Sequence, residues 1–284
     1  MRSLTAGVAK KKSAKSSTGS AVKLPIVCDA DMLRSLVRKR EVRVVDVRKV
    51  DDYNKDHIPT AVSLPLARVL ENDTPDKIVD IMEELGISDK TPVVVYDDTF
   101  GALAARVAWT FQYVGHFNTA LLEMTFKQWK ELGLETEKQA RTFPRAKHSL
   151  NINKEIYADA SYVEAVKSQP GKMLIDSRER LNFLTEHIPG AKNIPYTMVG
   201  SNGSILRKPE ELKRFIENRG IADNAEIITY CGSVGTLSGL TYYALKLAGF
   251  QNVKLYPKSF KEWKALGKPK EEFKDATYWD LSAE

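Results

Sequence analysis

The sequence predicts an α/β protein with two similar domains in tandem, each a parallel sheet flanked by helices. Three observations predict this fold class: an internal repeat, short apolar strands that alternate with helices in each copy, and the chain length. The chain has 284 residues, which is long for one domain and comfortable for two of about 130 residues each. We therefore expect two separate cores.

The repeat is visible in paired motifs. Asp46-Val47-Arg48 and His57-Ile58-Pro59 recur 130 residues later as Asp176-Ser177-Arg178 and His187-Ile188-Pro189. Later pairs stand 134 residues apart, namely Pro75 with Pro209, Gly86 with Gly220, Tyr96 with Tyr230, Gly101 with Gly235, and 126–133 with 260–267. The four extra residues lie near 200–203, where Gly, Ser and Asn predict a surface loop.

The elements follow the same order in both copies. The patterns predict a capped helix from Asp29 or Asp31 and from Asp159 or Ser161, strands 42–47 and 173–175, Pro-initiated helices 75–85 and 209–218 that end at Gly86 and Gly220, strands 93–96 and 227–230, and a helical stretch 237–249. Apolar strands alternating with helices indicate a parallel sheet covered on both faces, where ligands bind beyond the carboxyl ends of the strands.

Composition divides the chain into a tail, two domains and a linker. We expect a basic tail at 1–24, a first domain at 25–135, a polar linker at 136–154 and a second domain at 155–284. Residues 1–25 hold six basic residues and no acid, and without them 37 basic residues face 37 acids. The neutral body offers no basic field for a phosphate backbone, so we expect no nucleic-acid partner.

The tail bears on localisation. It lacks the apolar core of a secretory signal, and its basic, Ser-rich composition fits either a transit peptide or a disordered solvated tail. No apolar run reaches membrane-spanning length, so we expect no membrane partner. Only two cysteines occur, Cys28 and Cys231, with no metal-ligand spacing. These features predict a reducing compartment, the cytoplasm or the mitochondrial matrix, and no metal.

Cys231 stands at a predicted strand-to-helix junction. It opens the loop Cys231-Gly232-Ser233-Val234-Gly235-Thr236 after an apolar strand. The unpaired N–H groups and positive dipole end of a helix favour an anion such as a thiolate there. Gly232 and Gly235 are expected to let the backbone curl, so that successive N–H groups form an anion pocket. The pattern predicts an activated cysteine, although a lone intracellular cysteine is more commonly a small buried side chain.

These motifs together resemble the tandem-domain rhodaneses, the family of thiosulfate and 3-mercaptopyruvate sulfurtransferases. The resemblance covers Leu24 to about Gly267 and rests on the paired Asp-x-Arg and His-Ile-Pro segments, the Tyr-Cys-x-x-x-x-Thr loop, and the Leu-Tyr-x-x-Ser-Phe-x-x-Trp ending. It implies a first domain without the cysteine and a catalytic second domain. Asp97 does stand where Cys231 stands in the second copy.

The resemblance implies a two-step sulfur transfer without a cofactor. Cys231 would take sulfane sulfur from a small anionic donor as a persulfide and pass it to a thiol or cyanide, with loop residues Gly232, Val234, Gly235 and Thr236 forming the cradle. Arg178 would bind the anionic end of the donor, or would form an ion pair with Asp176. Ser233 would form a relay with His57, unless His57 and His187 only fasten a loop by hydrogen bonds.

Thiosulfate is the expected donor, with 3-mercaptopyruvate as the alternative. The uncharged loop is similar to that of mercaptopyruvate enzymes, but segment 180–186 is too short for the arginine-bearing insertion of that branch. A phosphatase that uses the same cradle would need an arginine six residues after the cysteine, where Leu237 stands. A catalytically silent binding module is the third alternative.

Overall fold

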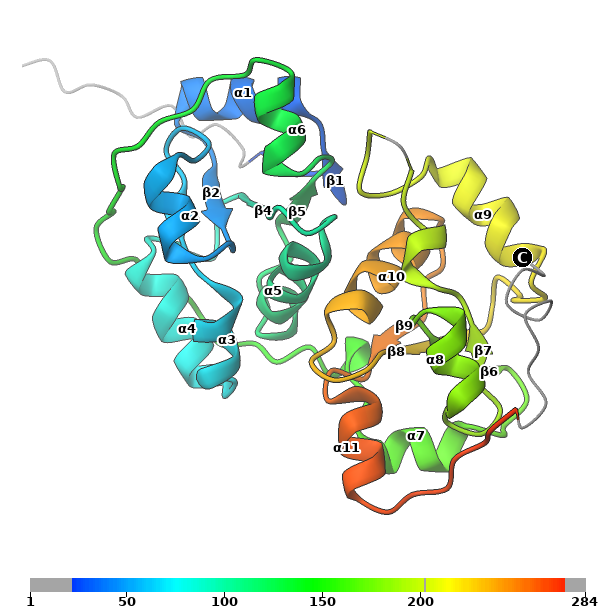
Figure 1. Ribbon diagram of the computed structural model, residues 1–284. Coiled ribbons are helices and arrows are strands. Elements are labelled where there is room, and N and C mark those ends of the chain that lie inside the picture. Colours follow the sequence, from blue (N-terminus) through cyan, green and yellow to red (C-terminus); the bar gives the residue numbers. More distant parts are fainter. Residues whose placement is uncertain (1–21, 202, 274–284) are drawn as a thin grey trace, which may run out of the picture.

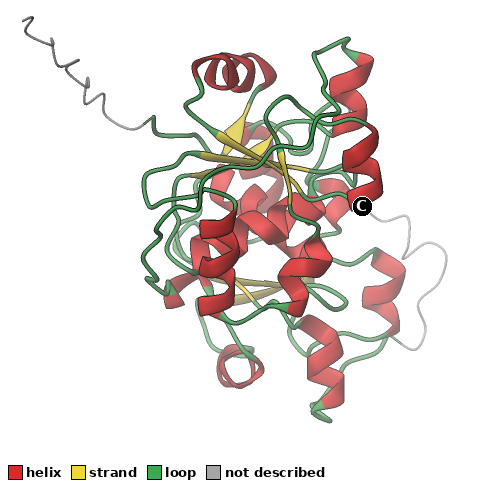
Figure 2. Cartoon of the chain, turned by 90° about the vertical axis from the view of Figure 1, so that its left-hand side faces the viewer, coloured by secondary structure: helices red, strands yellow, loops and turns green. Residues whose placement is uncertain are grey.

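The computed structural model describes residues 22–201 and 203–273, which form two α/β units side by side (Figure 1). Most of the predicted basic tail lies outside the described residues. Helices lie on both faces of the strands in each unit, as the side view shows (Figure 2). This layering buries the β-branched strands on both sides and confirms the predicted fold class.

The first unit is built on a five-stranded parallel sheet. Its strands are β1 (Val27–Cys28), β2 (Arg43–Asp46), β3 (Val62–Ser63), β4 (Val93–Tyr96) and β5 (Thr119–Leu122), in the order β1-β5-β4-β2-β3. Its helices are α1 (Ala30–Lys39), α2 (Val50–Lys55), α3 (Leu66–Glu71), α4 (Pro75–Glu84), α5 (Ala102–Tyr113) and α6 (Phe126–Glu131).

The second unit repeats this plan with a four-stranded parallel sheet. Its strands are β6 (Lys172–Asp176), β7 (Lys192–Asn193), β8 (Glu226–Tyr230) and β9 (Val253–Leu255), in the order β7-β6-β8-β9. Its helices are η1 (Lys154–Ile156), α7 (Ala160–Val166), α8 (Arg180–Thr185), η2 (Tyr196–Met198), α9 (Pro209–Glu217), α10 (Thr236–Leu247) and α11 (Ser259–Ala265). The bridge between Tyr157 and Leu255 takes the place that β1 has in the first sheet.

Local signals explain where several helices begin and end. Asp29 and Asp159 cap α1 and α7, each accepting a hydrogen bond from a first-turn N–H group. Proline opens α4 and α9, and Gly86 and Gly220 follow them with positive φ angles of 70° and 69°. The two-residue strands and the short helices α2, α3 and α8 had no clear pattern, because elements of that length carry little periodicity.

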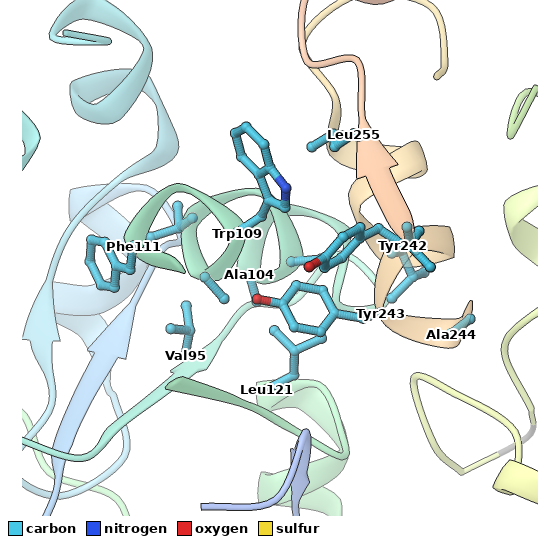
Figure 3. Packing of buried hydrophobic residues seen from close by; sticks show 14 of the residues in the cluster. Val95, Ala104, Trp109, Phe111, Leu121, Tyr242, Tyr243, Ala244 and Leu255 are labelled. Atoms are coloured by element: carbon cyan, nitrogen blue, oxygen red, sulfur yellow. The ribbon is translucent and has the colours of Figure 1, made fainter. Parts of the chain in front are cut away.

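The two units share one continuous apolar core through α5 and α10. These helices face each other in the middle of the molecule, and Ala104 and Trp109 of α5 lie against Tyr242 and Tyr243 of α10 (Figures 1 and 3). A Cβ atom at Gly239 would lie 3.4 Å from the backbone nitrogen of Arg106, in ordinary van der Waals contact, so the two helix backbones lie close together here. The helix that follows the Cys231 loop is therefore held by the first unit.

The loop that holds the extra residues of the second copy also touches the first unit. Ile205 N–H donates to the Glu123 carbonyl at 2.7 Å, and Ser204 Oγ donates to the same oxygen at 3.1 Å. Ile205 is buried, and a Cβ atom at Gly101 would lie 2.7 Å from its Cδ1. Composition predicted only a surface loop here, because contacts between the units leave no mark on local sequence.

Residues 136–153 of the predicted 136–154 linker pack along the first unit. Glu137 exchanges backbone hydrogen bonds with His57, and Ala146 N–H donates to the Glu83 carbonyl. In the described part of the chain, no helix is long and apolar enough to cross a bilayer.

Candidate active site

Cys231 follows β8 directly and lies before the first turn of α10. Its side chain is only 2% exposed, while Gly232, Ser233 and Val234 after it are exposed. A parallel strand that runs into a helix brings the cysteine to the carboxyl edge of the sheet, where the α10 N-terminus favours negative charge. The position has the geometry that the sequence predicted.

The first unit shows what this loop geometry binds. Asp97, the counterpart of Cys231, is buried and accepts hydrogen bonds from Thr99 N–H at 2.8 Å, Gly101 N–H at 2.9 Å and Ala104 N–H at 2.9 Å. Burial raises the pKa of this carboxyl group, and the amides act against that rise. The loop of the first unit that corresponds to the Cys231 loop thus holds a carboxylate with its backbone amides. The equivalent amides around Cys231 belong to Ser233, Gly235 and Ser238.

Of the two loop glycines, only Gly235 needs to be glycine. Its φ is 77°, and a Cβ atom there would lie 3.1 Å from the Pro257 Cα and 3.2 Å from the Pro257 carbonyl oxygen. Gly101 has the same N-cap role and a φ of 86°. Gly232 is not among the glycines with positive φ, and a Cβ atom there would meet only Arg178 Cδ at 3.8 Å. The position of Gly232 therefore does not require the conformational freedom of glycine.

Arg106 reaches the loop from the first unit and was missed by sequence reasoning. It lies on α5, is 7% exposed, and its Nε donates to the Val234 carbonyl at 2.8 Å. Burial lowers the pKa of Arg106 to about 10, and Asp73 and Cys231 act in the opposite direction, so the guanidinium stays charged at neutral pH. A lone arginine in the Ala-rich helix of 102–113 was the available signal.

Ser259 fixes the cysteine from the other side. Cys231 N–H donates to Ser259 Oγ at 3.1 Å, the Cys231 Sγ lies 3.7 Å from that oxygen, and Ser259 Oγ donates to the Tyr256 carbonyl at 2.9 Å. Ser259 has a φ of 57°, which is uncommon for a residue other than glycine. This serine belongs to the C-terminal motif that supported the family resemblance, but sequence alone did not assign it to the site.

Arg178 forms the ion pair that was the alternative to donor binding. Its Nε lies 3.0 Å from both Asp176 carboxylate oxygens, and its Nη2 donates to Asp176 Oδ2 and to the Glu186 carbonyl, each at 2.6 Å. Arg48 makes the same contacts with Asp46 and Asp56 in the unit without the cysteine. The repetition favours a structural role, although Arg178 also lines a cavity beside Gly232.

His57 does not meet Ser233 in this structure. Its side chain is fully buried in the first unit, with Nδ1 2.8 Å from the Tyr53 carbonyl and Nε2 3.2 Å from the Gln139 carbonyl. Both ring nitrogens therefore face backbone oxygens. The predicted relay between His57 and Ser233 is therefore wrong. His57 instead fastens a loop by hydrogen bonds to backbone carbonyl groups, and His187 does the same, with its Nδ1 2.8 Å from the Phe183 carbonyl oxygen.

Two cavities flank the exposed part of the loop. One of about 450 Å³ lies between the units and includes Ser233 and Val234, and the other, of about 540 Å³, includes Gly232 and Arg178. Lys261 lines both, and its N–H donates to the Gly232 carbonyl at 3.0 Å. In the described part of the chain, no cluster of three or more His, Cys, Asp or Glu side chains could hold a metal ion.

Cys28 is the last residue of β1 and directly precedes Asp29, the N-cap of α1. It is fully buried, and burial together with Asp29 and Glu123 raises the pKa of its thiol to about 12. A thiol of this kind stays protonated and unreactive at neutral pH.

The fold and site define a tandem α/β protein with one cysteine in a strand-to-helix loop, whose counterpart in the first unit holds a carboxylate. The rhodanese-like domain profile matches residues 29–132 and 159–266. The chain therefore belongs to the rhodanese-like domain family and contains two copies of the domain.

Named relatives agree with this membership and place the chain in the sulfurtransferase class of enzymes. A probable 3-mercaptopyruvate sulfurtransferase of Schizosaccharomyces pombe is 32% identical over 76% of this chain and 75% of its own length. The sulfur carrier protein TtuD of Thermus thermophilus is 28% identical over 84% of this chain and 93% of its own length.

Solved structures show the same arrangement. SseA from Escherichia coli, a 3-mercaptopyruvate sulfotransferase, matches with a TM-score of 0.75 and 25% identity over 84% of this chain and 99% of its own. The anaerobic ergothioneine biosynthesis enzyme from Chlorobium limicola matches with a TM-score of 0.78 over 87% of this chain and 70% of its own, at 19% identity. The second match bears on the fold alone.

Proposed function

We propose that the protein moves sulfane sulfur from thiosulfate to a thiol or cyanide through a persulfide on Cys231. The observation that carries the proposal is the pair of equivalent positions, Cys231 and Asp97. The first-unit loop holds the Asp97 carboxylate with three backbone amides. The same loop around Cys231 offers an anion cradle to a thiolate or a persulfide, which stabilises the charged sulfur at both stages.

The chemistry proceeds in two displacements. The Cys231 thiolate attacks the outer sulfur of thiosulfate, a new S–S bond forms, and the S–S bond of the donor breaks as sulfite leaves with the electron pair. The acceptor then attacks the outer sulfur of the persulfide, and Cys231 leaves as a thiolate. Arg106 and Ser259 hold the loop in place through Val234 and the Cys231 backbone. The cycle uses no metal or organic cofactor.

The charges near the loop support thiosulfate as the donor. A compact dianion needs a concentrated positive site, and Lys261 and Lys264 line the cavity that also includes Gly232. Arg178 is already paired with Asp176. 3-Mercaptopyruvate is the second candidate, because enzymes of that name are among the relatives of this chain. The thiol chemistry would suit the reducing cytoplasm or mitochondrial matrix.

The test combines a variant with two donors. Cys231→Ser should abolish sulfur transfer with the fold intact, since the two side chains are close in size, and Cys28→Ser is the matched control that should keep full activity. Steady-state kcat/KM for thiosulfate and for 3-mercaptopyruvate, with cyanide as the acceptor, compares the donors. A clear preference for mercaptopyruvate would refute the thiosulfate proposal. Turnover by Cys231→Ser would refute the role of Cys231, and no turnover of either donor by the wild type would indicate a silent binding module.

A further inference from the structure

The cavity between the units is larger than the proposed donor or cyanide requires. Its volume of about 450 Å³ falls within the range of about 300–1,000 Å³ that is typical of pockets for organic ligands. Ser233 and Val234 of the Cys231 loop form part of its wall. A ligand in this cavity would therefore lie beside the reacting sulfur.

Aromatic rings from both units line the cavity. Trp109 and Tyr113 of α5 stack with ring centroids 5.4 Å apart and planes 5° from parallel, and Tyr157 of the second unit lies 5.2 Å from Tyr113. Leu70 and Ala265 add aliphatic surface. A wall of this kind binds a flat apolar body through area burial and ring stacking.

The charges that line the cavity disfavour binding of the anionic sulfur donor there. Asp73 and Glu262 line it together with Arg106, Lys258 and Lys261, and Lys258 is paired with Glu262 at 3.2 Å. Two carboxylates and an apolar wall are a poor environment for a free dianion. The ligand that fits this cavity is largely apolar. Because the donor is a dianion, this ligand is the sulfur acceptor.

We propose that this cavity binds the sulfur acceptor, a small organic thiol with an aromatic body, and presents its sulfur to the Cys231 persulfide. This inference rests on the proposed function. The acceptor thiolate, its proton released to solvent, attacks the outer sulfur and forms a new S–S bond. The bond between that sulfur and Cys231 breaks, and Cys231 leaves as a thiolate. The product is the persulfide of the acceptor.

The test measures discharge of the preformed persulfide in single turnovers by intact-protein mass. Phenylmethanethiol is compared with 2-mercaptoethanol, a thiol of similar acidity that lacks the aromatic ring. Cyanide is the control acceptor, because it is too small to depend on the cavity. The wild type should react with phenylmethanethiol about tenfold faster or more, as burial of a ring implies. Ala265→Trp, at the exposed rim, should remove most of this preference and leave the cyanide rate unchanged. Glu131→Trp, at the equivalent end of α6, is the control that should keep the preference.

Several outcomes would overturn the inference: equal rates for the two thiols, an unchanged preference in Ala265→Trp, a loss of the cyanide rate in that variant, or faster discharge by a cysteine-containing peptide. Failure of thiosulfate to form any persulfide would instead refute the proposed function, before a thiol is added. Binding of phenylmethanol to the protein without the persulfide would then test whether the cavity accepts an aromatic ligand. It should be retained in Glu131→Trp and lost in Ala265→Trp, and equal binding by both variants would contradict the inference.

Discussion

Replacement of Arg106 by methionine tests whether the first unit controls the catalytic loop of the second. Arg106→Met removes the hydrogen bond to the Val234 carbonyl and the buried positive charge that interacts with Cys231, while it keeps an unbranched side chain of similar length. We expect a slower reaction in a folded protein, because the loop amides lose their fixed position and the charged sulfur loses a nearby cation.

The size of the effect follows from the contact. A hydrogen bond from a charged donor contributes about 1.5–3 kcal/mol, which corresponds to a decrease of about 10- to 160-fold in kcat/KM if it acts fully on the transition state. The thermal midpoint should change little, since burial already lowers the pKa of Arg106 to about 10 and methionine removes that burial cost. The loss should appear mainly in kcat, because the positioned loop amides stabilise the charged sulfur more strongly in the transition state than in the complex with bound donor.

The assay is steady-state turnover of thiosulfate with cyanide, together with thermal unfolding of each variant. Arg43→Met is the matched control. Arg43 is likewise buried on the first unit, and burial lowers its pKa to about 10, but its guanidinium lies over Phe143 and its Nη2 donates to the Gly86 carbonyl. An unchanged kcat/KM in Arg106→Met, or an equal loss in Arg43→Met, would refute the reasoning.

Three further predictions use the repeat and the buried histidines. Asp97→Ala should lower the free energy of unfolding by about 2 kcal/mol, because three amides lose their acceptor, yet leave kcat near the wild-type value; an inactive but folded variant would contradict a silent first domain. Arg178→Lys and Arg48→Lys should each lower the thermal midpoint by a similar amount, and a rise in the KM for the donor in Arg178→Lys alone would show that Arg178 also binds it. Burial lowers the pKa of His116 to about 4, from 6.5 in a solvated histidine. The unfolded chain then binds a proton below pH 6.5 that the folded chain refuses until about pH 4. Urea unfolding should therefore show a loss of stability of up to about 3 kcal/mol as the pH falls through this range, and His116→Asn should flatten the slope.

The sequence was most informative where function depends on a short local segment. Cys231 and Asp97 could be placed at strand ends because an apolar strand, a glycine and a helical pattern follow one another within a few residues. Because the motifs repeat, the second sheet could be predicted from the first. The parallel sheets and the buried β-branched strands are consequences of the same local signals.

Contacts between the units could not be predicted in this way. Arg106 and Val234 are separated by 128 residues, and nothing in either segment specifies that α5 packs on α10. The resemblance led to a wrong relay for His57 because a pattern does not show which way a ring nitrogen points. For Arg178 a better signal existed in the sequence, since Asp46 and Arg48 stand at the same spacing in a copy that has no cysteine.

The first unit acts as an internal reference for the second. Both loops begin at a strand end and reach a glycine N-cap with φ near the left-handed region, 86° at Gly101 and 77° at Gly235. In the first loop three amides already donate to the Asp97 carboxylate. In the second loop the exposed residues 232–234 open onto two cavities. A carboxylate that satisfies the amides of its own loop in the first unit thus corresponds to a thiol in the second unit, where the proposed thiolate or persulfide would supply the anion.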